Sequence, residues 1–223
     1  MQSLPMRRAG RQAQSGFTLV EIAIVLVIIG LLLGGVLKGQ ELIENGRVKN
    51  AANDMNGIVA AYNSYLDRYR KLPGDDGPVA TLTARGPSWA AMAAGNNDGV
   101  VNATAAQTFT GGEAETFFRH LRASGFITGN PADVGANAFP VNAWGGRLGV
   151  ANVAVQGRPA ARVMVCLGNV PGKAAAALDV QLDDGRPNNG SFRATQGANN
   201  VVPGGAAAAY NESQTYTICR DIT

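Results

Sequence analysis

A run of mostly apolar residues from Phe17 to Leu37 constrains the fold of this chain more than any other feature. Only Thr18, Glu21 and glycines interrupt it. As an α-helix the run would rise roughly 31 Å, which is enough to cross the hydrocarbon core of a bilayer. We therefore expect residues 17–37 to form a membrane-spanning helix, because a chain in lipid must satisfy its own backbone hydrogen bonds.

The helical pattern continues beyond the apolar run with a different composition. From Val48 to Tyr69, apolar residues recur at spacings of three and four, with charged and amide side chains between them. This periodicity predicts that residues 38–71 form an amphipathic continuation of the same helix. We expect the helix to end at Leu72, because a Pro-Gly pair follows and opens a turn.

Residues 72–223 are rich in Gly, Ala, Asn and Pro, with short segments that have the pattern of regular structure. The segment Glu113–Ser124 is predicted as a second helix, with Gly125 as a left-handed cap and Phe126 folded back onto the last turn. The predicted strands are 147–156, 161–167, 178–182 and 214–219, and 199–209 is predicted as loop. The expected fold class is therefore α+β, a long N-terminal helix packed on a small antiparallel-sheet head.

The distribution of charge argues against a nucleic-acid-binding protein, although the sequence pI is about 9.1. Arg7, Arg8 and Arg11 account for the whole excess of 19 basic over 16 acidic residues. Residues 17–223 are formally neutral, so no strong nucleic-acid binding is expected. A membrane-tethered enzyme is also disfavoured, because the sequence shows no nucleophile–base, phosphate-loop or metal-ligand pattern and contains one histidine.

The stretch GFTLVE, residues 16–21, leads directly into the apolar run. It resembles the processing motif of prepilins, the precursors of type IV pilins and type II secretion pseudopilins. The resemblance is close over residues 15–50 and looser beyond them. It implies that a prepilin peptidase cuts between Gly16 and Phe17, that the new N-terminus at Phe17 is methylated, and that Glu21 is needed for assembly with other pilin or pseudopilin subunits.

The implied role of Glu21 fits elementary physical chemistry. A carboxylate inside a membrane helix costs roughly 2.5–3.5 kcal/mol on insertion scales, so it requires a compensating contact. Cleavage would create a positive α-amine at Phe17, four residues away on one helix face, and the first turn of a helix favours an anion. In a filament the carboxylate could meet the amine of a neighbouring subunit, where a buried pair sets register more than it adds stability.

The resemblance also implies the location of the chain. Residues 1–16 would be a cleaved cytoplasmic leader, the helix a single pass through the bacterial inner membrane, and the head periplasmic, before transfer to an extracellular pilus or a periplasmic pseudopilus. Charge alone does not orient the span, because three basic residues flank each side. A secretory signal is disfavoured, since its apolar region is shorter, lacks an acid and precedes its cleavage site. A plain membrane anchor is the other alternative.

A structural filament subunit is the favoured function, and we expect a minor one. Major subunits of the family usually place a proline at the position of Lys38, and a lysine near a packed filament interior must be solvated or paired in every copy. Glu41 is placed to pair with it. Conversely, four glycines between residues 30 and 39 each weaken a helix by roughly 1 kcal/mol relative to alanine, which could allow the unwinding that proline promotes. A major pilin and a ligand-binding tip subunit, for adhesion or DNA uptake, stay open as alternatives.

Cys166 and Cys219 are the only cysteines of the sequence, and they lie too far apart for a redox or zinc motif. In an exported domain we expect them to form a disulfide, because thiols oxidise outside the cytoplasm. The bond would join the third-from-last predicted strand to the last one.

Two loops rich in side-chain oxygens, 96–99 and 183–189, are weak candidates for calcium sites. The heads of major pseudopilins bind calcium as a family, and the candidate ligands here are Asp183, Asp184 and Asn189. Neither loop has the spacing of an EF-hand, and Asn, Asp and Gly also dominate plain turns. Turns are therefore favoured, and no cofactor is expected.

Three further side chains receive structural assignments. His120 is the one histidine of the sequence and has no partner for metal or proton chemistry nearby in the chain, so we expect it on the surface of the second helix. Trp89 and Trp144 are expected to anchor the core.

Overall fold

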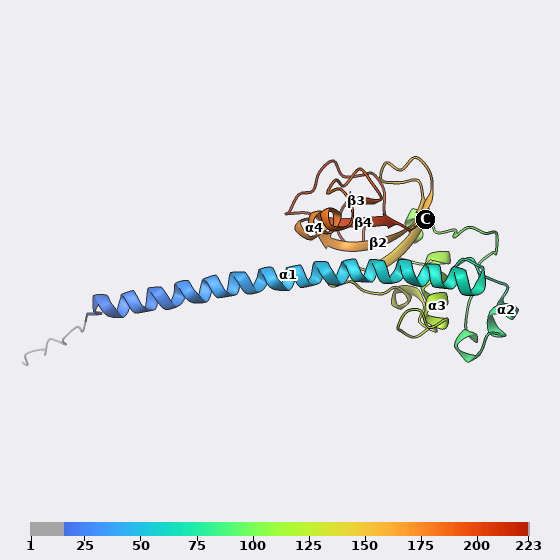
Figure 1. Cartoon of the computed structure of the whole chain (residues 1–223), viewed down its shortest axis with the longest axis horizontal. Coiled ribbons are helices and arrows are strands. Elements are labelled where there is room, and N and C mark those ends of the chain that lie inside the picture. The colour runs from blue at the N-terminus through green and yellow to red at the C-terminus, as the bar shows by residue number, and fades with distance from the viewer. Residues whose placement is uncertain (1–15, 223) are drawn as a thin grey trace, which may run out of the picture. The chain divides into compact units, whose positions relative to one another are not determined.

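The computed structural model describes residues 16–222. The chain divides into two compact units, one that ends at Ile43 and one that begins at Glu44, and helix α1, Leu19–Tyr69, contributes to both (Figure 1). Apart from Gly16, the predicted leader lies outside the described residues. The expected fold class is confirmed, because a long N-terminal helix is followed by a small antiparallel sheet.

The first unit consists, in its described part, of the apolar stretch of α1. Its aliphatic side chains are exposed around the whole helix, from Leu19 at 90% to Ile43 at 60%. Among the described residues, α1 is the one helix that is long and apolar enough to cross a membrane. The predicted apolar helix is therefore present, and none of the described residues of its unit covers it.

The end of α1 differs from the predicted boundary. The helix stops at Tyr69 instead of continuing to Leu72. Arg70 adopts a left-handed conformation with a φ of 54°, while its N–H still donates to the carbonyl of Leu66 at 2.9 Å. The residues before Pro73 are excluded from the helix, because proline disfavours the α conformation in the residue that precedes it.

Eight side chains of α1 form its buried face in the second unit. They recur at spacings of three and four, as the amphipathic pattern predicts. They are Val48, Ala51, Ala52, Met55, Ile58, Ala61, Tyr62 and Tyr65. This face meets helix α3, Gly112–Ala123, where the rings of Tyr62 and Phe117 stack with centroids 6.2 Å apart.

The end of α3 has the predicted cap. Gly125 has a φ of 79°, which favours glycine, and the N–H groups of Phe126 and Ile127 both donate to the carbonyl of Leu121. Phe126 packs against the core from this position. The shorter elements of the head are α2, Val79–Thr83, and three 3₁₀ turns, Pro87–Trp89, Ala105–Gln107 and Gly135–Ala138.

The sheet contains four antiparallel strands in the order β1-β2-β4-β3. Their bounds are Leu148–Val153 for β1, Arg162–Pro171 for β2, Phe192–Gln196 for β3 and Thr215–Asp221 for β4. The predictions of strands at 147–156, 161–167 and 214–219 are confirmed, and residues 199–209 form a loop as predicted.

The two faces of the sheet contribute side chains to two different hydrophobic clusters. Along β2, Val163, Val165 and Leu167 join the main core with α1 and α3, because alternate residues of a strand point to opposite sides. Met164 and Cys166 point the other way into a small second cluster under Phe109. The disulfide therefore lies on the face of the sheet that α1 does not cover.

Two elements differ from the sequence prediction. The expected strand 178–182 is wrong, since these residues end helix α4, Gly172–Leu182, which packs on the sheet (Figure 1). Four consecutive alanines, 174–177, favour this helix. Strand β3 was missed because it is short and half polar, and its pairing with β4 depends on tertiary contacts.

Candidate functional site

Glu21 completes a capping box at the start of α1. Thr18 is the residue before the first helical residue, and its N–H and its hydroxyl both donate to Oε2 of Glu21 at 2.8 Å. In return, the N–H of Glu21 donates to Oγ1 of Thr18 at 3.3 Å. The pattern T-x-x-E is typical of this arrangement, which gives hydrogen-bond acceptors to the otherwise free N–H groups of Thr18 and Glu21 at the start of the helix. Sequence reasoning could have found it and did not.

The capping box changes the expected relation between Phe17 and Glu21. Gly16, Phe17 and Thr18 are not helical, and all are exposed, so Phe17 and Glu21 do not share a helix face in this chain. The argument from i,i+4 spacing concerns the cleaved chain that begins at Phe17, and for that chain it stays a prediction. The side chain of Phe17 is 84% exposed, and a Cβ added to Gly16 would meet nothing within 4 Å. Within residues 16–222, nothing covers Gly16 or Phe17.

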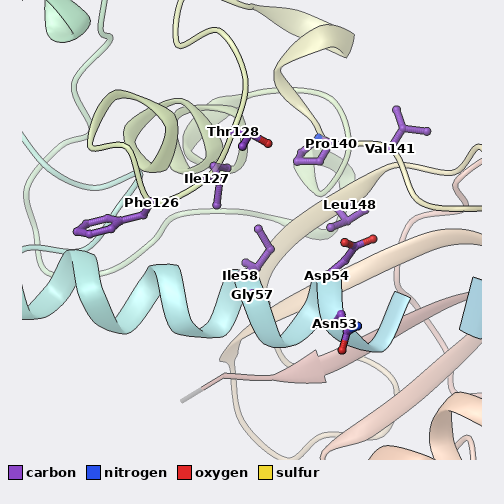
Figure 2. Close-up of a pocket in the computed structure, with 10 residues that line it drawn as sticks. All are labelled: Asn53, Asp54, Gly57, Ile58, Phe126, Ile127, Thr128, Pro140, Val141 and Leu148. Atoms are coloured by element: carbon purple, nitrogen blue, oxygen red, sulfur yellow. The ribbon is translucent and has the colours of Figure 1, made fainter. Parts of the chain in front are cut away.

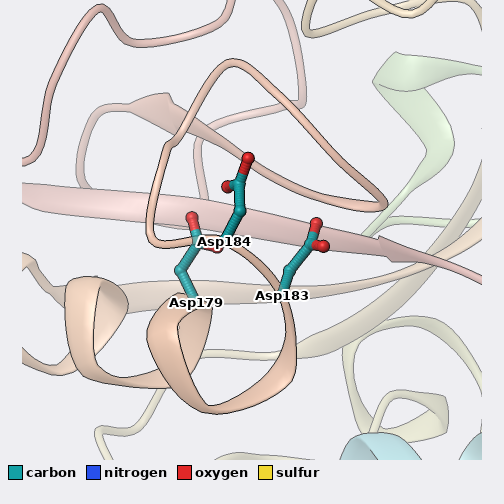
Figure 3. Close-up of side chains that lie close together, drawn as sticks. All are labelled: Asp179, Asp183 and Asp184. Carbon is teal, nitrogen blue, oxygen red and sulfur yellow. The ribbon is translucent and has the colours of Figure 1, made fainter.

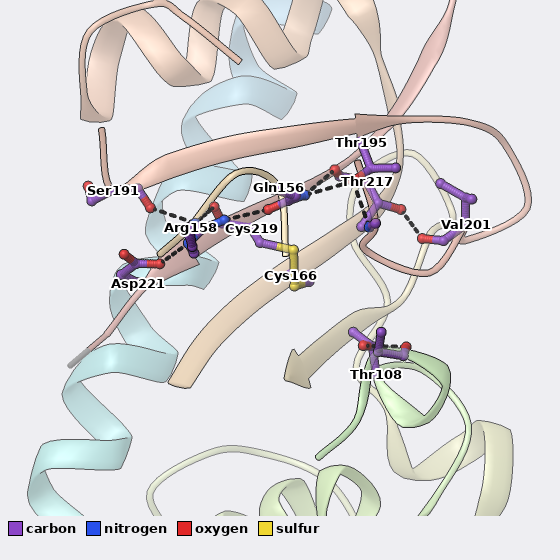
Figure 4. Close-up of a disulfide and its surroundings, with 12 residues drawn as sticks. Thr108, Gln156, Arg158, Cys166, Ser191, Thr195, Val201, Thr217, Cys219 and Asp221 are labelled. Atoms are coloured by element: carbon purple, nitrogen blue, oxygen red, sulfur yellow. Dashed lines mark hydrogen bonds and ion pairs between the residues drawn. A yellow bond between two sulfur atoms is a disulfide. The ribbon is translucent and has the colours of Figure 1, made fainter. Parts of the chain in front are cut away.

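The predicted disulfide is confirmed. Cys166 on β2 and Cys219 on β4 are directly opposite in the strand register and are bonded, across a separation of 53 residues (Figure 4). Both residues are fully buried. The bond closes the chain over α4 and β3, so it ties the head together through its last strand.

A buried arginine lies beside the disulfide, and sequence reasoning missed it. The guanidinium of Arg158 donates to Oδ1 of Asp221 and Oε1 of Gln156, both at 2.6 Å, and to the carbonyls of Ser191 and Cys219 at 3.0 Å (Figure 4). Burial lowers the pKa of Arg158, and the neighbouring Asp221 carboxylate opposes that shift. The guanidinium is hydrogen-bonded to all four of these acceptors, so it holds the end of β4 against the neighbouring segments and is not available for catalysis.

Three carboxylates meet at the end of α4, with oxygens within 4.8 Å of one another (Figure 3). Asp183 and Asp184 are predicted candidates, whereas Asp179, which is buried, was not predicted. Asp179 accepts hydrogen bonds from the N–H of Gly185 at 2.9 Å and the hydroxyl of Tyr210 at 2.6 Å. Burial raises the pKa of Asp179.

Internal donors already engage the other members of this group. Asp184 accepts from the N–H of Arg186, which lowers its pKa, and from the amide nitrogen of Asn189 at 2.7 Å. Oδ2 of Asp183 accepts the N–H of Phe192 at 2.9 Å. The third candidate ligand, Asn189, turns its donor nitrogen toward the cluster. These contacts are those of a turn, and a calcium site here stays a prediction.

The second oxygen-rich loop, 96–99, is held by hydrogen bonds from its own backbone. The carboxylate of Asp75 accepts the N–H groups of Asp98 and Gly99, and Glu113 accepts the N–H of Asn96 at 3.3 Å. Asp98 itself accepts from the amide of Asn102, which is the main cause of its lowered pKa. The loop is therefore a turn whose backbone N–H groups are held by hydrogen bonds to Asp75 and Glu113.

The prediction that His120 lies on the helix surface is wrong. His120 is fully buried, its Nδ1 accepts the N–H of Gly74 at 3.1 Å, and its Nε2 lies 2.9 Å from the carbonyl of Ala93. Burial lowers the pKa of His120 to about 4. The histidine is thus a neutral crosslink between α3 and two loops, because its helix faces the 73–95 segment, which the sequence alone did not place.

Next to His120 is a polar cluster that sequence reasoning also missed. Asp76 accepts hydrogen bonds at 2.7 Å from the hydroxyl of Tyr65 and from the guanidinium of Arg85. Arg85 lies over the rings of Tyr69 and Trp89, at 4.2 and 4.9 Å from the centroids. Burial raises the pKa of Tyr65, and its bond to Asp76 adds to the shift. These contacts fix the loop after α1 and provide no open site.

The two tryptophans differ in burial. Trp89 is 2% exposed and belongs to the main core, as predicted. Trp144 is only partly buried, packs on the edge of that core, and donates from its indole to Oε1 of Glu44 at 2.8 Å. Trp144 therefore anchors the loop before β1 to α1 within the second unit.

Comparisons with known proteins bear on the N-terminal segment first. The family described as the prokaryotic N-terminal methylation motif matches residues 11–37. A fimbrial protein, EcpC of Eikenella corrodens, is 30% identical over 102 residues, which cover 44% of this chain and 67% of that protein. No solved structure matches the chain. The matched motif contains the GFTLVE segment and the apolar part of α1.

Proposed function

This chain belongs to the prepilin family of type IV pilins and type II secretion pseudopilins, and from that premise we propose that it is a minor subunit of a type IV pilus or a type II secretion pseudopilus. It is a pilin-like structural subunit with an apolar N-terminal helix that fits membrane anchoring. The family is structural, and no catalytic activity is proposed for the head.

Processing forms the first part of the proposal. A prepilin peptidase cuts between Gly16 and Phe17, and the amine of Phe17 is methylated. The head then faces the periplasm, and the subunit joins the filament through α1. The support is the methylation motif over residues 11–37 together with the unobstructed exposure of Gly16 and Phe17.

Intact mass and N-terminal sequencing of membrane-extracted protein test the processing step. We expect a chain that begins at Phe17 and carries one added methyl group. Gly16→Val is the matched variant: a Cβ at this position meets no other side chain within residues 16–222, so failure of cleavage reports the peptidase and not misfolding of the head. A mature start at Met1, or a cut after residue 37, contradicts the proposal.

Lys38 is the observation that carries the choice of a minor subunit. It takes the place of the proline of major subunits, and α1 continues through it without interruption. Its ammonium pairs with Glu41 at 2.7 Å, in an exposed contact that contributes at most about 1 kcal/mol. A few copies in a filament tolerate such a charge near the packed helices more easily than a whole shaft of copies.

Quantitative mass spectrometry of sheared filaments tests the copy number. We expect this protein to be present in small amounts relative to the dominant chain. If it is the most abundant chain of the filament, the minor-subunit proposal is wrong and the major-pilin alternative replaces it.

A further inference from the structure

A groove of about 330 Å³ runs along α1 in the second unit (Figure 2). Its floor is aliphatic: Ile58 from α1 and Ile127 from the segment after α3 point toward one another, and Leu148 continues the surface at the start of β1. Val141 stands at the rim and is 65% exposed. The groove therefore combines a largely buried aliphatic floor with polar side chains, those of Asn53, Asp54 and Thr128, and it lies within the second unit.

One carboxylate interrupts this apolar surface. Asp54 projects from α1 beside Leu148, and no residue within 16–222 bonds to its oxygens (Figure 2). Partial burial by the groove raises the pKa of the Asp54 carboxyl, and no opposite charge offsets the shift. No basic side chain lines the groove. The surface therefore complements a segment that combines an aliphatic side chain with a cation.

The chain itself carries such a segment between the apolar span and the head. Leu42 and Ile43 are 62% and 60% exposed although they follow the span, so they are large apolar side chains without cover in their own unit. Lys38 precedes Leu42 by four residues, which places both on one helix face. Its partner Glu41 is an exposed neighbour on the same helix, and such pairs exchange at little cost.

We propose that the groove receives residues 38–43 of α1 from a second copy of this chain, with Leu42 over the aliphatic floor and Lys38 paired with Asp54. The contact uses a helix-in-groove arrangement. Two different surfaces meet, so it is heterologous and leads to an open assembly instead of a closed dimer. It rests on the proposed function as a filament subunit, and it needs only two adjacent copies.

The position of the two surfaces along α1 restricts when the contact forms. Lys38 and Leu42 precede Glu44, where the second unit begins, and Asp54 follows it in the sequence. The contact therefore joins the first unit of one copy to the second unit of its neighbour, and we expect it in the assembled filament and not in the membrane pool.

Cysteine crosslinking tests this geometry in the full chain. Leu42→Cys and Thr128→Cys are combined, since Thr128 lines the groove and the described residues contain no free thiol. Oxidation should give a crosslinked dimer of this chain in sheared filaments, with longer oligomers only where more copies adjoin, and neither single variant should crosslink. Absence of the dimer in filaments that contain the double variant, or an equal amount of dimer in the membrane fraction, overturns the proposal.

Charge reversal tests the ion pair separately. Asp54→Lys should lower the filament-to-membrane ratio about tenfold, which corresponds to about 1.4 kcal/mol. The double variant with Lys38→Glu should restore the ratio. The carboxylate of Asp54 makes no hydrogen bond or ion pair within residues 16–222, so the substitution should not destabilise the head. A thermal melt of each extracted variant checks that the head is folded. Normal incorporation of Asp54→Lys, or failure of the double variant to recover, contradicts the pairing.

Filling the groove provides the third test. Gly57→Leu places a side chain in open space on the groove wall, and leucine favours helix more than glycine, so the head should stay folded. Gly205→Leu is the matched control, since a Cβ there also meets nothing within 4 Å among the described residues and Gly205 lies outside both contacting surfaces. We expect loss of incorporation for Gly57→Leu alone. If Asp54→Lys and Gly57→Leu both assemble normally while Glu21→Ala does not, the proposed contact is wrong and the function as a filament subunit stands.

Discussion

Leu31 and Leu32 on α1 are 73% and 63% exposed, whereas Leu121 and Leu167 in the head are fully buried. The same residue type thus has opposite environments in the two units of one chain. The head buries its apolar side chains in its own core, so its stability is intramolecular. The described stretch of α1 up to Ile43 has no such core, and its exposed apolar surface fits burial in a membrane or against other subunits. Variants of the first stretch should therefore change assembly, and variants of the buried core of the head should change unfolding.

The largest expected effect concerns Glu21, where the two roles of the carboxylate can be separated. Glu21→Ala removes both the cap and the charge, so we expect insertion and cleavage but loss of incorporation into filaments. Glu21→Gln keeps an oxygen that can accept the N–H of Thr18 and removes only the charge. Immunoblots of sheared filaments against the membrane fraction measure both.

The glutamine variant decides which role matters. We expect Glu21→Gln to fail like Glu21→Ala, because a neutral amide does not pair with a neighbouring amine. If it assembles normally, Glu21 acts only as the N-terminal cap of α1. Normal assembly of Glu21→Ala would show that this residue is not needed for assembly. It would also contradict the expectation that variants of the first unit change assembly.

Loss of the disulfide should be the largest change confined to the head. Cys166→Ala with Cys219→Ala opens a loop of 53 residues, which lowers the free energy of unfolding by about 4 kcal/mol in the chain-entropy model. Denaturant titration of extracted protein measures this value. A reductant should destabilise the wild type and leave the double variant unchanged. Two reactive thiols in the unfolded, unreduced wild type contradict the prediction.

A smaller effect should come from His120. Its pKa in the folded state, about 4, lies below its ordinary value of 6.5, so the unfolded chain binds the proton more tightly. Stability from this group is therefore complete above pH 6.5 and declines as the pH falls toward 4, by at most about 3 kcal/mol.

The variant His120→Gln isolates this contribution, since it removes the titration and keeps an acceptor and a donor. We expect its unfolding free energy to depend less on pH between 6.5 and 4 than that of the wild type. Asp76, Arg85 and Arg119 are the charged groups that act on His120, and all three are present in both proteins, so the difference between the two pH profiles belongs to the imidazole. Identical profiles contradict the assignment.

Calcium should have the smallest effect on the head. The carboxylates of Asp179 and Asp184 already accept internal hydrogen bonds, so we expect no measurable change of melting temperature when EGTA or calcium is added. A rise with calcium that disappears in Asp183→Asn/Asp184→Asn would instead establish a metal site at the end of α4.

Local sequence patterns were sufficient for the course of α1 and for α3 with its C-terminal cap, because helix periodicity and glycine act on neighbouring residues. The capping box of α1 and its exact end at Tyr69 were not predicted. They were insufficient for 178–182, where an alanine run outweighed a short apolar stretch, and for β3, which exists through its pairing with β4. The disulfide could be predicted because only one pairing of two cysteines exists. His120 could not, since its partners Gly74 and Ala93 are 46 and 27 residues away.

The sequence by itself determined the processing motif, the apolar helix and the acid within it, because each depends on contiguous residues whose spacing is visible in the chain. Only the tertiary structure decided which polar groups are buried and which carboxylate is left without a partner. Asp76, Asp179 and Asp54 are the same residue type, yet the first two are enclosed with donors and the third lines an open groove. That difference arises from which distant segments pack around each carboxylate, and no local pattern encodes it.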